Sequence, residues 1–203
     1  GFARWLEARM GPLAHARRLD LVQRRAYATV DDVPAYQLKT PLQRAIQLLK
    51  RHRDVMFADN PEVAPISMIL TNLSGQAYNG ETDVYLAVRG ILNRMLDFVH
   101  QDGPFVPNPT HPAEDYADKW STDPRLEHNF RLWHAQASRD FEQVPGLADR
   151  VSLKAATKRS FRVDLSDNHF ARLGLQSASP IVITSAAPVV QISSAPKPWG
   201  PRA

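Results

Sequence analysis

Two glutamines and a lysine recur at helical spacing in the segment KTPLQRAIQLLKRHRD, residues 39–54. Because each residue turns a helix by about 100°, Gln43, Gln47 and Lys50 share one face, beside an apolar stripe. Their amides and ammonium group can donate hydrogen bonds to phosphate oxygens and base edges, with no carboxylate in the row to compete. The plainer interpretation is a solvated face, with a cation near the helix C-terminus complementing the dipole. Spacing alone favours this plainer interpretation.

A second candidate is Ser67, which follows Pro65 at the predicted start of the next helix. A serine in this position can bind phosphate together with the unpaired N–H groups of the first helical turn. More often such a serine caps the helix or bonds back to a neighbouring carbonyl group. The sequence leaves both roles open.

Other patterns that signal catalysis are missing from the sequence. It contains no P-loop, no GxGxxG and no GxSxG, and it has no cysteine for a disulfide or a thiolate-bound zinc. No pair at the i, i+4 spacing of helical metal ligands occurs among His100, His111, His128 and His134. We therefore predict no metal site in these residues and no self-contained active site in the chain.

Positive charge is concentrated at the beginning of the 203-residue chain, whose formal net charge is +4. The basic residues of the first 53 positions are Arg4, Arg9, Arg17, Arg18, Arg24, Arg25, Lys39, Arg44, Lys50, Arg51 and Arg53. A local basic field suits ligands that carry phosphate, either nucleotides or nucleic acid, and a solvated basic surface is the alternative. No apolar run approaches the ~20 residues that span a bilayer, so we expect no membrane partner, and the absence of cysteine fits a cytoplasmic protein.

The spacing of apolar residues predicts helices in most of the chain. The expected helices cover 2–10, ending at Gly11-Pro12, then 13–28, 41–54, 65–78, 84–99 and a last strong one from Pro124 to about Pro145. Thr40 and Thr82 are the expected N-caps of the third and fifth of these, because a threonine hydroxyl accepts from the free N–H groups there. In the third, Leu42, Ala45, Ile46 and Leu49 form the stripe that we expect to be buried.

Residues 102–124 contain five prolines and no periodicity, and we predict an ordered loop there. After residue 145 the signals weaken to a short helix at 151–163, a β-prone segment at 180–192 and a Pro-rich end. The predicted fold class is therefore mainly α: a helical bundle with a Pro-rich loop and a weakly structured C-terminal tail. We predict a helical domain at 1–145 and an extension with a Pro/Ser-rich tail at 146–203.

Four segments together resemble a known family. They are GFARWL, TPLQRAIQLLKRHRD, APISMILTNLSGQAY and VPNPTHPAEDYADKW, at residues 1–6, 40–54, 64–78 and 106–120. Their order and spacing are similar to those in the C-terminal half of bacterial cGAS/DncV-like nucleotidyltransferases (CD-NTases), which make cyclic oligonucleotide second messengers in antiphage defence. The layout also resembles oligoadenylate synthetases, and the resemblance covers roughly residues 1–142.

The resemblance implies a role for each candidate. In that family the helical half closes over the nucleotidyltransferase sheet, and the cleft between them holds the donor nucleoside triphosphate. By position in the motifs, Lys50 would contact the triphosphate, Gln47 would line the same cleft and Ser67 would reach the phosphates. Gln43 is the weaker candidate of the four. The resemblance assigns structural roles to Asn108, Pro109 and Trp120.

The chain also departs from the family. The Gly-Ser turn and the three metal-binding aspartates of the family precede the matched segments, and they do not occur in this sequence. The Mg²⁺ expected for the complete enzyme would therefore have its ligands outside this chain. Asp115 stands where relatives have an asparagine that makes a loop hydrogen bond, and we expect it to replace that bond. Because the sequence begins with Gly1 and an aromatic residue, we expect a fragment or a processed chain.

The leading hypothesis is the helical, donor-binding portion of a nucleotidyltransferase that makes cyclic di- or trinucleotide second messengers, inactive by itself. Its expected partners are nucleoside triphosphates, the missing catalytic lobe and, through the nucleotide product, a downstream effector. The alternative is a non-catalytic basic module that binds nucleic acid or a partner protein. Salt dependence distinguishes the two, because binding through nucleic-acid phosphates weakens steeply with salt.

Overall fold

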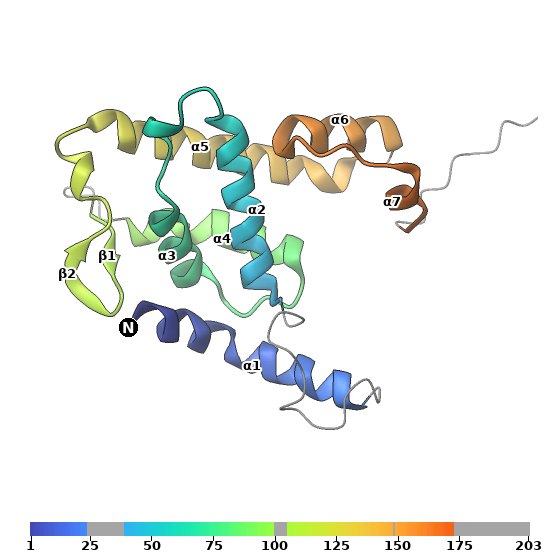
Figure 1. Ribbon diagram of the computed structural model, residues 1–203, viewed down its shortest axis with the longest axis horizontal. Helices are drawn as coiled ribbons and strands as arrows, with labels where there is room; N and C mark the ends of the chain where they lie inside the picture. Colours follow the sequence, from blue (N-terminus) through green and yellow to red (C-terminus); the bar gives the residue numbers. More distant parts are fainter. Residues whose placement is uncertain (24–38, 100–104, 148, 173–203) are drawn as a thin grey trace, which may run out of the picture.

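A computed structural model of the protein describes residues 1–23, 39–99, 105–147 and 149–172, and helices make up most of them (Figure 1). The helices are α1 (Phe2–Gln23), α2 (Pro41–Met56), α3 (Ser67–Ala77), α4 (Val84–Arg94), α5 (Pro124–Gln143), α6 (Arg150–Phe161) and α7 (Asp167–Arg172). Short 3₁₀ turns lie at η2 (Pro61–Val63), η3 (Met95–Phe98), η4 (Asp118–Trp120) and η5 (Val144–Gly146). The predicted mainly α fold class is confirmed.

Helix α2 is the central element of this bundle. In Figure 1 it runs between α1 at one edge and α5 and α6 at the other, and it packs against α3, α4, α5 and α6. Its start is set locally, because Thr40 and Gln43 form a capping box and Pro41 occupies the first turn, where no N–H is needed. The predicted stripe is buried: Leu42, Ala45 and Leu49 are fully enclosed and Ile46 is nearly so.

The core collects the apolar faces of α2, α3, α4 and α5. Its largest fully enclosed side chains include Trp133 and Phe130 of α5, whose ring centroids lie 6.0 Å apart. Asp123 accepts a hydrogen bond from the backbone N–H of Arg125, so α5 begins at Asp123-Pro124 as predicted. The helix ends at Gln143, just before Pro145-Gly146, also as predicted.

The expectation that the first helix ends at Gly11-Pro12 is wrong, because α1 continues through Pro12. A proline inside a helix removes one backbone hydrogen bond and normally clashes with a Cβ on the residue before it. Gly11 has no Cβ, so the second conflict does not arise. The predicted helix at 13–28 is thus the second half of α1 up to Gln23, and its last residues lie outside the described part of the chain.

Helix α1 docks on α3 through a close approach at Gly75. A Cβ at Gly75 would lie 2.7 Å from Cη2 of the Trp5 indole, so a larger residue cannot fit there without movement. Beside this contact, the Arg9 guanidinium donates to the carbonyl oxygens of Gly75 (2.8 Å) and Gln76 (2.9 Å) at the C-terminal end of α3. Those carbonyls have no partner within the helix, so Arg9 supplies one.

The N-cap of α4 is Asp83 and not Thr82 as expected. Its carboxylate accepts from the backbone N–H groups of Tyr85 (2.8 Å) and Leu86 (3.0 Å). Aspartate is preferred over threonine at the N-cap, so residue type was a usable sign in favour of Asp83.

The Pro-rich segment forms a small antiparallel hairpin of β1 (Pro107–Asn108) and β2 (His111–Asp115), where the sequence indicated only a loop. Asn108 donates to Glu114 and accepts from the Thr110 N–H, which fixes the turn. Asp115 accepts from the N–H groups of Val106 (2.9 Å) and Ala117 (2.8 Å). So short a strand pair leaves no alternation to detect.

The structural role expected of Trp120 is confirmed. Its side chain is buried, and its ring lies 5.3 Å from that of Phe130.

Some expectations fall on residues that the structure does not describe: the loop after residue 28, part of the segment before residue 105, and the β-prone and Pro-rich stretches after residue 172. The short helix predicted at 151–163 is present as α6. Among the described helices, none has both the length and the apolarity to cross a membrane.

Candidate functional site

The candidate site lies where the last turns of α2 approach the start of α3. Lys50 is half-buried on α2, and Ser67 is the exposed first residue of α3, after the turn that contains η2. Arg53, one turn after Lys50, links the two helices, because its Nη1 donates to the Ser67 hydroxyl oxygen at 3.1 Å. Two predicted residues, Lys50 and Ser67, thus lie near Arg53, which was not predicted.

Arg53 has a defined position at this junction. Its Nη1 also donates to the Pro65 carbonyl oxygen (2.7 Å), and its Nε donates to the Asp54 carboxylate (2.9 Å). The side chain is only 12% exposed. Sequence reasoning assigned Arg53 to the helix dipole, although its i+3 spacing from Lys50 was a usable sign that both cations share a face.

The start of α3 is open to an anion. Its N-cap residue, Ile66, makes no side-chain hydrogen bond to the first turn. The first N–H groups of a helix have no partner within it, and the dipole places partial positive charge there. The Ser67 hydroxyl and the Arg53 guanidinium lie at the same end. Helix start, hydroxyl and cation together form an arrangement that binds phosphate.

Electrostatics at Lys50 are consistent with an anion site. Burial lowers the pKa of the Lys50 ammonium group, and the positive charge of Arg53 lowers it further, while Asp54 acts in the opposite direction. Both lowering effects penalise the charged form of the lysine. A bound anion would reduce both effects, because its negative charge balances Lys50 and Arg53 and its oxygens replace the water that the buried ammonium group lacks.

A cleft of about 470 Å³ opens beside this junction. Its lining combines a polar side with an apolar wall: Arg53, Asp54, Phe57, Ala58, Pro61, Ala64, Pro65, Ile66 and Ser67. Its size is within the usual range for small-molecule pockets. Of the four residues predicted from sequence, Ser67 lines this cleft, whereas Lys50, Gln47 and Gln43 do not.

The two glutamines of the predicted row have different surroundings. The Gln43 side-chain oxygen accepts from the Thr40 backbone N–H at 2.9 Å, so this side chain is used to begin α2. Gln47 is exposed on the next turn. Between Gln43 and Lys50 the helix rises by about 10 Å, so the row extends well away from the start of α3.

Metal ligands are not grouped in the part of the chain that the structure describes. No set of three or more His, Asp or Glu side chains there could hold a metal ion. The Mg²⁺ implied by the family resemblance therefore does not fit a site among these residues.

No family model matches the chain, but it is similar to a curated protein in sequence and to a solved structure in fold. A c-di-GMP synthase from Roseivirga ehrenbergii is 34% identical over 134 residues, which is 64% of this chain and 35% of that protein. The fold is similar to that of the Bradyrhizobium diazoefficiens CD-NTase CdnG, solved in complex with GTP, with a TM-score of 0.57 and 24% identity. That match covers 79% of this chain and 50% of CdnG. The chain thus spans about a third of the curated relative.

Proposed function

Because this chain is related to the cGAS/DncV-like nucleotidyltransferases, we propose that it is the helical lobe that binds the donor nucleoside triphosphate in a synthase of cyclic nucleotides. The complete protein would join nucleoside triphosphates by attack of a ribose hydroxyl on an α-phosphate, with pyrophosphate leaving. The catalytic residues of that reaction would lie on the other lobe. This chain would contribute the groups that hold the triphosphate.

One observation carries the proposal: the uncapped start of α3, with Ser67 hydrogen-bonded to Arg53 and with Lys50 nearby on α2. Each group is suited to one part of a polyphosphate. The Ser67 hydroxyl and the first N–H groups of α3 can donate to a single phosphate. Arg53 and Lys50 supply positive charge, which a triphosphate needs most because it carries several negative charges in a short length.

In this proposal Arg53 changes partners when the ligand binds. Its Nη1 now donates to the Pro65 carbonyl and the Ser67 hydroxyl, and Asp54 balances its charge. Asp54 is half-exposed, so water can solvate it if Arg53 turns toward a phosphate. Lys50 and Ser67 keep the roles that the family resemblance implies. Gln47, exposed one turn earlier, would contact a more distant part of the nucleotide.

The alternative, a nucleic-acid-binding module, is supported by the basic charge of the first 53 residues. Several of those cations are engaged within the molecule, however. Arg9 binds carbonyl groups at the end of α3, Arg51 donates to the Phe161 carbonyl at 2.9 Å, and Arg53 binds Asp54. Cations held in this way contribute less to a broad phosphate-binding surface, so we favour the triphosphate site.

The test is Lys50→Ala in the full-length protein, with Lys154→Ala on the exposed face of α6 as the matched control. Losing one charge-assisted contact costs about 1.5–3 kcal/mol, so affinity for ATP or GTP should fall roughly 10- to 150-fold. The control should bind like the wild type. Equal affinity and equal product formation in Lys50→Ala would refute the site assignment.

A second titration separates the two functions. ATP, GTP and a short RNA are added to the wild-type protein at two salt concentrations. A triphosphate site should prefer one nucleotide. Stronger binding of RNA than of both nucleotides, with a steep loss at high salt, would favour the nucleic-acid alternative.

The wider biological setting is part of the same proposal. The nucleotide product would act on a downstream effector in antiphage defence, the reaction would take place in the cytoplasm, and the catalytic lobe would be the direct partner of this one. Product size and linkage depend on how both lobes hold the acceptor nucleotide. Analysis of the products of the full-length protein by mass spectrometry would identify them.

A further inference from the structure

The last turns of α2 have a second side, which faces away from the candidate site. Lys50 and Arg53 are three residues apart on one face of α2, from which Arg53 reaches the start of α3, while Arg51 and His52 lie on other faces. His52 is buried, at 2% exposure, and its ring lies 6.1 Å from that of Phe161 in α6. The turn that carries the two cations is therefore held from behind by helices that lie later in the chain.

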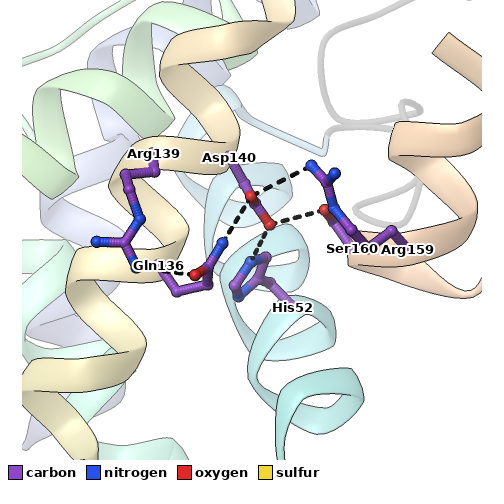
Figure 2. Close-up of polar contacts among 6 residues, drawn as sticks. All are labelled: His52, Gln136, Arg139, Asp140, Arg159 and Ser160. Carbon is purple, nitrogen blue, oxygen red and sulfur yellow. Dashed lines mark hydrogen bonds and ion pairs between the residues drawn. The ribbon is translucent and has the colours of Figure 1, made fainter. Parts of the chain in front are cut away.

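Asp140 of α5 is the centre of this rear contact (Figure 2). Its carboxylate lies 3.1 Å from His52 Nε2 and accepts from the Ser160 hydroxyl (2.8 Å) and the Gln136 amide (2.8 Å). Burial opposes ionisation of Asp140, but the hydrogen bonds from Ser160, His52 and Gln136 keep its pKa below the usual value. One ionised carboxylate thus joins α2, α5 and α6.

A separate bond ties α6 to the same turn. Arg51 Nε donates to the Phe161 carbonyl oxygen at 2.9 Å, at the end of α6. That carbonyl belongs to the last residue of α6 and has no partner within the helix, so the contact satisfies both groups. The Ser160 hydroxyl reaches α2 only through Asp140 and His52, whereas the Arg51 bond joins α2 and α6 directly.

We propose that α6 positions the last turn of α2 for triphosphate binding, with Ser160 and Asp140 as positioning residues that act through His52. The inference rests on the proposed function, and it assigns a role to a helix that lies beyond the segments resembling the nucleotidyltransferases. Without the Ser160 hydroxyl, Asp140 loses one of its donors, and α6 keeps only the longer Arg159 contact with Asp140 (3.5 Å) and the bond from Arg51 to Phe161. Lys50 and Arg53 would then be held less firmly over the start of α3.

The size of the effect follows from how binding depends on geometry. A displacement of about 1 Å in a positioned group can cost on the order of a hundredfold in function. Ser160→Ala removes one of the hydrogen bonds to Asp140 and leaves the apolar packing of α6 in place, so we expect a loss of about tenfold in triphosphate affinity. Arg51→Met, which keeps the aliphatic stem at an exposed position, should lose about threefold.

The experiment measures binding of the nucleoside triphosphate and of its monophosphate to the full-length protein, at a temperature where every variant is folded by circular dichroism. Ser160→Ala should weaken the triphosphate about tenfold and the monophosphate little, because Lys50 and Arg53 serve the phosphates beyond the first. A purely structural role would change the melting temperature but not this ratio. Ser160→Thr, which keeps the hydroxyl, should restore most of the affinity.

The matched control is Ser152→Ala on the first turn of the same helix, because Ser152 contacts Asp149 at the start of α6 and lies about two turns before Ser160. It should bind like the wild type. If folded Ser160→Ala and Arg51→Met both bind the triphosphate as the wild type does, the positioning role is wrong while the proposed function stands. If the wild type binds no triphosphate, the proposed function fails and the positioning role fails with it.

Discussion

The contact of Trp5 with Gly75 allows a sharp test of how α1 is held against the bundle. In Gly75→Ala the new Cβ would lie 2.7 Å and 2.8 Å from two atoms of the Trp5 indole and 3.0 Å from Leu6. An indole is rigid, so α1 must shift as a unit. Overpacking of this kind lowers the free energy of unfolding by about 1–3 kcal/mol. Replacing glycine by alanine in a helix raises it by about 1 kcal/mol, because alanine has the higher helix propensity. The net expectation is a loss of about 1 kcal/mol in the free energy of unfolding.

Urea denaturation of single and double variants measures this effect. Trp5→Leu removes the indole atoms that clash, so Gly75→Ala should destabilise the protein less in the Trp5→Leu background. If only the difference in helix propensity remains there, Gly75→Ala should raise the free energy of unfolding. Ser74→Ala is the control on the same helix, because the Ser74 hydroxyl is buried without a hydrogen-bond partner and its removal should be neutral or stabilising. A stabilising Gly75→Ala in the wild-type background would refute the argument, as would an equal cost with and without Trp5.

Two further predictions concern the cap of α4 and the buried histidine. Asp83→Ala should lower the free energy of unfolding by about 1 kcal/mol, because two N–H groups lose their acceptor, whereas Thr82→Ala should change it little in the same denaturation assay. Burial lowers the pKa of His52 in spite of the opposing contact with Asp140, so the folded protein binds fewer protons there than the unfolded chain. The free energy of unfolding should therefore begin to fall as the pH drops below about 6.5, the ordinary pKa of histidine. In melting curves recorded from pH 7.5 to 5, His52→Gln should reduce this pH dependence. An unchanged pH profile in His52→Gln would assign the effect to another group.

The low-pH behaviour has a second component at Asp140. Its pKa is lowered in the folded state, so the stability it contributes is present above the unfolded value, about 3.9, and is lost as the pH falls further. His52 Nδ1 is buried and has no hydrogen-bond partner among the described residues, so no described group would accept from a proton placed there. The two residues thus weaken the rear contact of α2 in successive pH ranges, the histidine first.

Elements with local signals were predictable from the sequence. Thr40-Pro41 and Asp123-Pro124 mark the starts of α2 and α5 because capping needs only neighbouring residues. The buried stripe of α2 followed from periodicity in the same way. The cap of α4 was predicted one residue too early, although aspartate is the preferred N-cap residue of the two.

The candidate site was predictable only in part. Lys50 and Ser67 were identified by type, position and family resemblance, and the structure places Arg53 in contact with one and near the other. That meeting depends on how α2 and α3 pack, which spacing does not specify. The cluster of His52, Asp140 and Ser160 brings together residues 88 and 20 positions apart, so nothing local could indicate it.

The continuation of α1 through Gly11 and Pro12 divides the helix into parts that open independently. Its first half is held by Trp5 and Arg9, and Leu13, directly after the proline, also packs on the hydrophobic core. Pro12 has no N–H, so one backbone hydrogen bond is missing between the two halves of α1. We therefore expect unwinding that starts near Gln23 to stop at the turn of Leu13 and Pro12, before it reaches the contacts of Trp5 and Arg9. The helix behaves as an anchored segment with a separate, locally unfolding end.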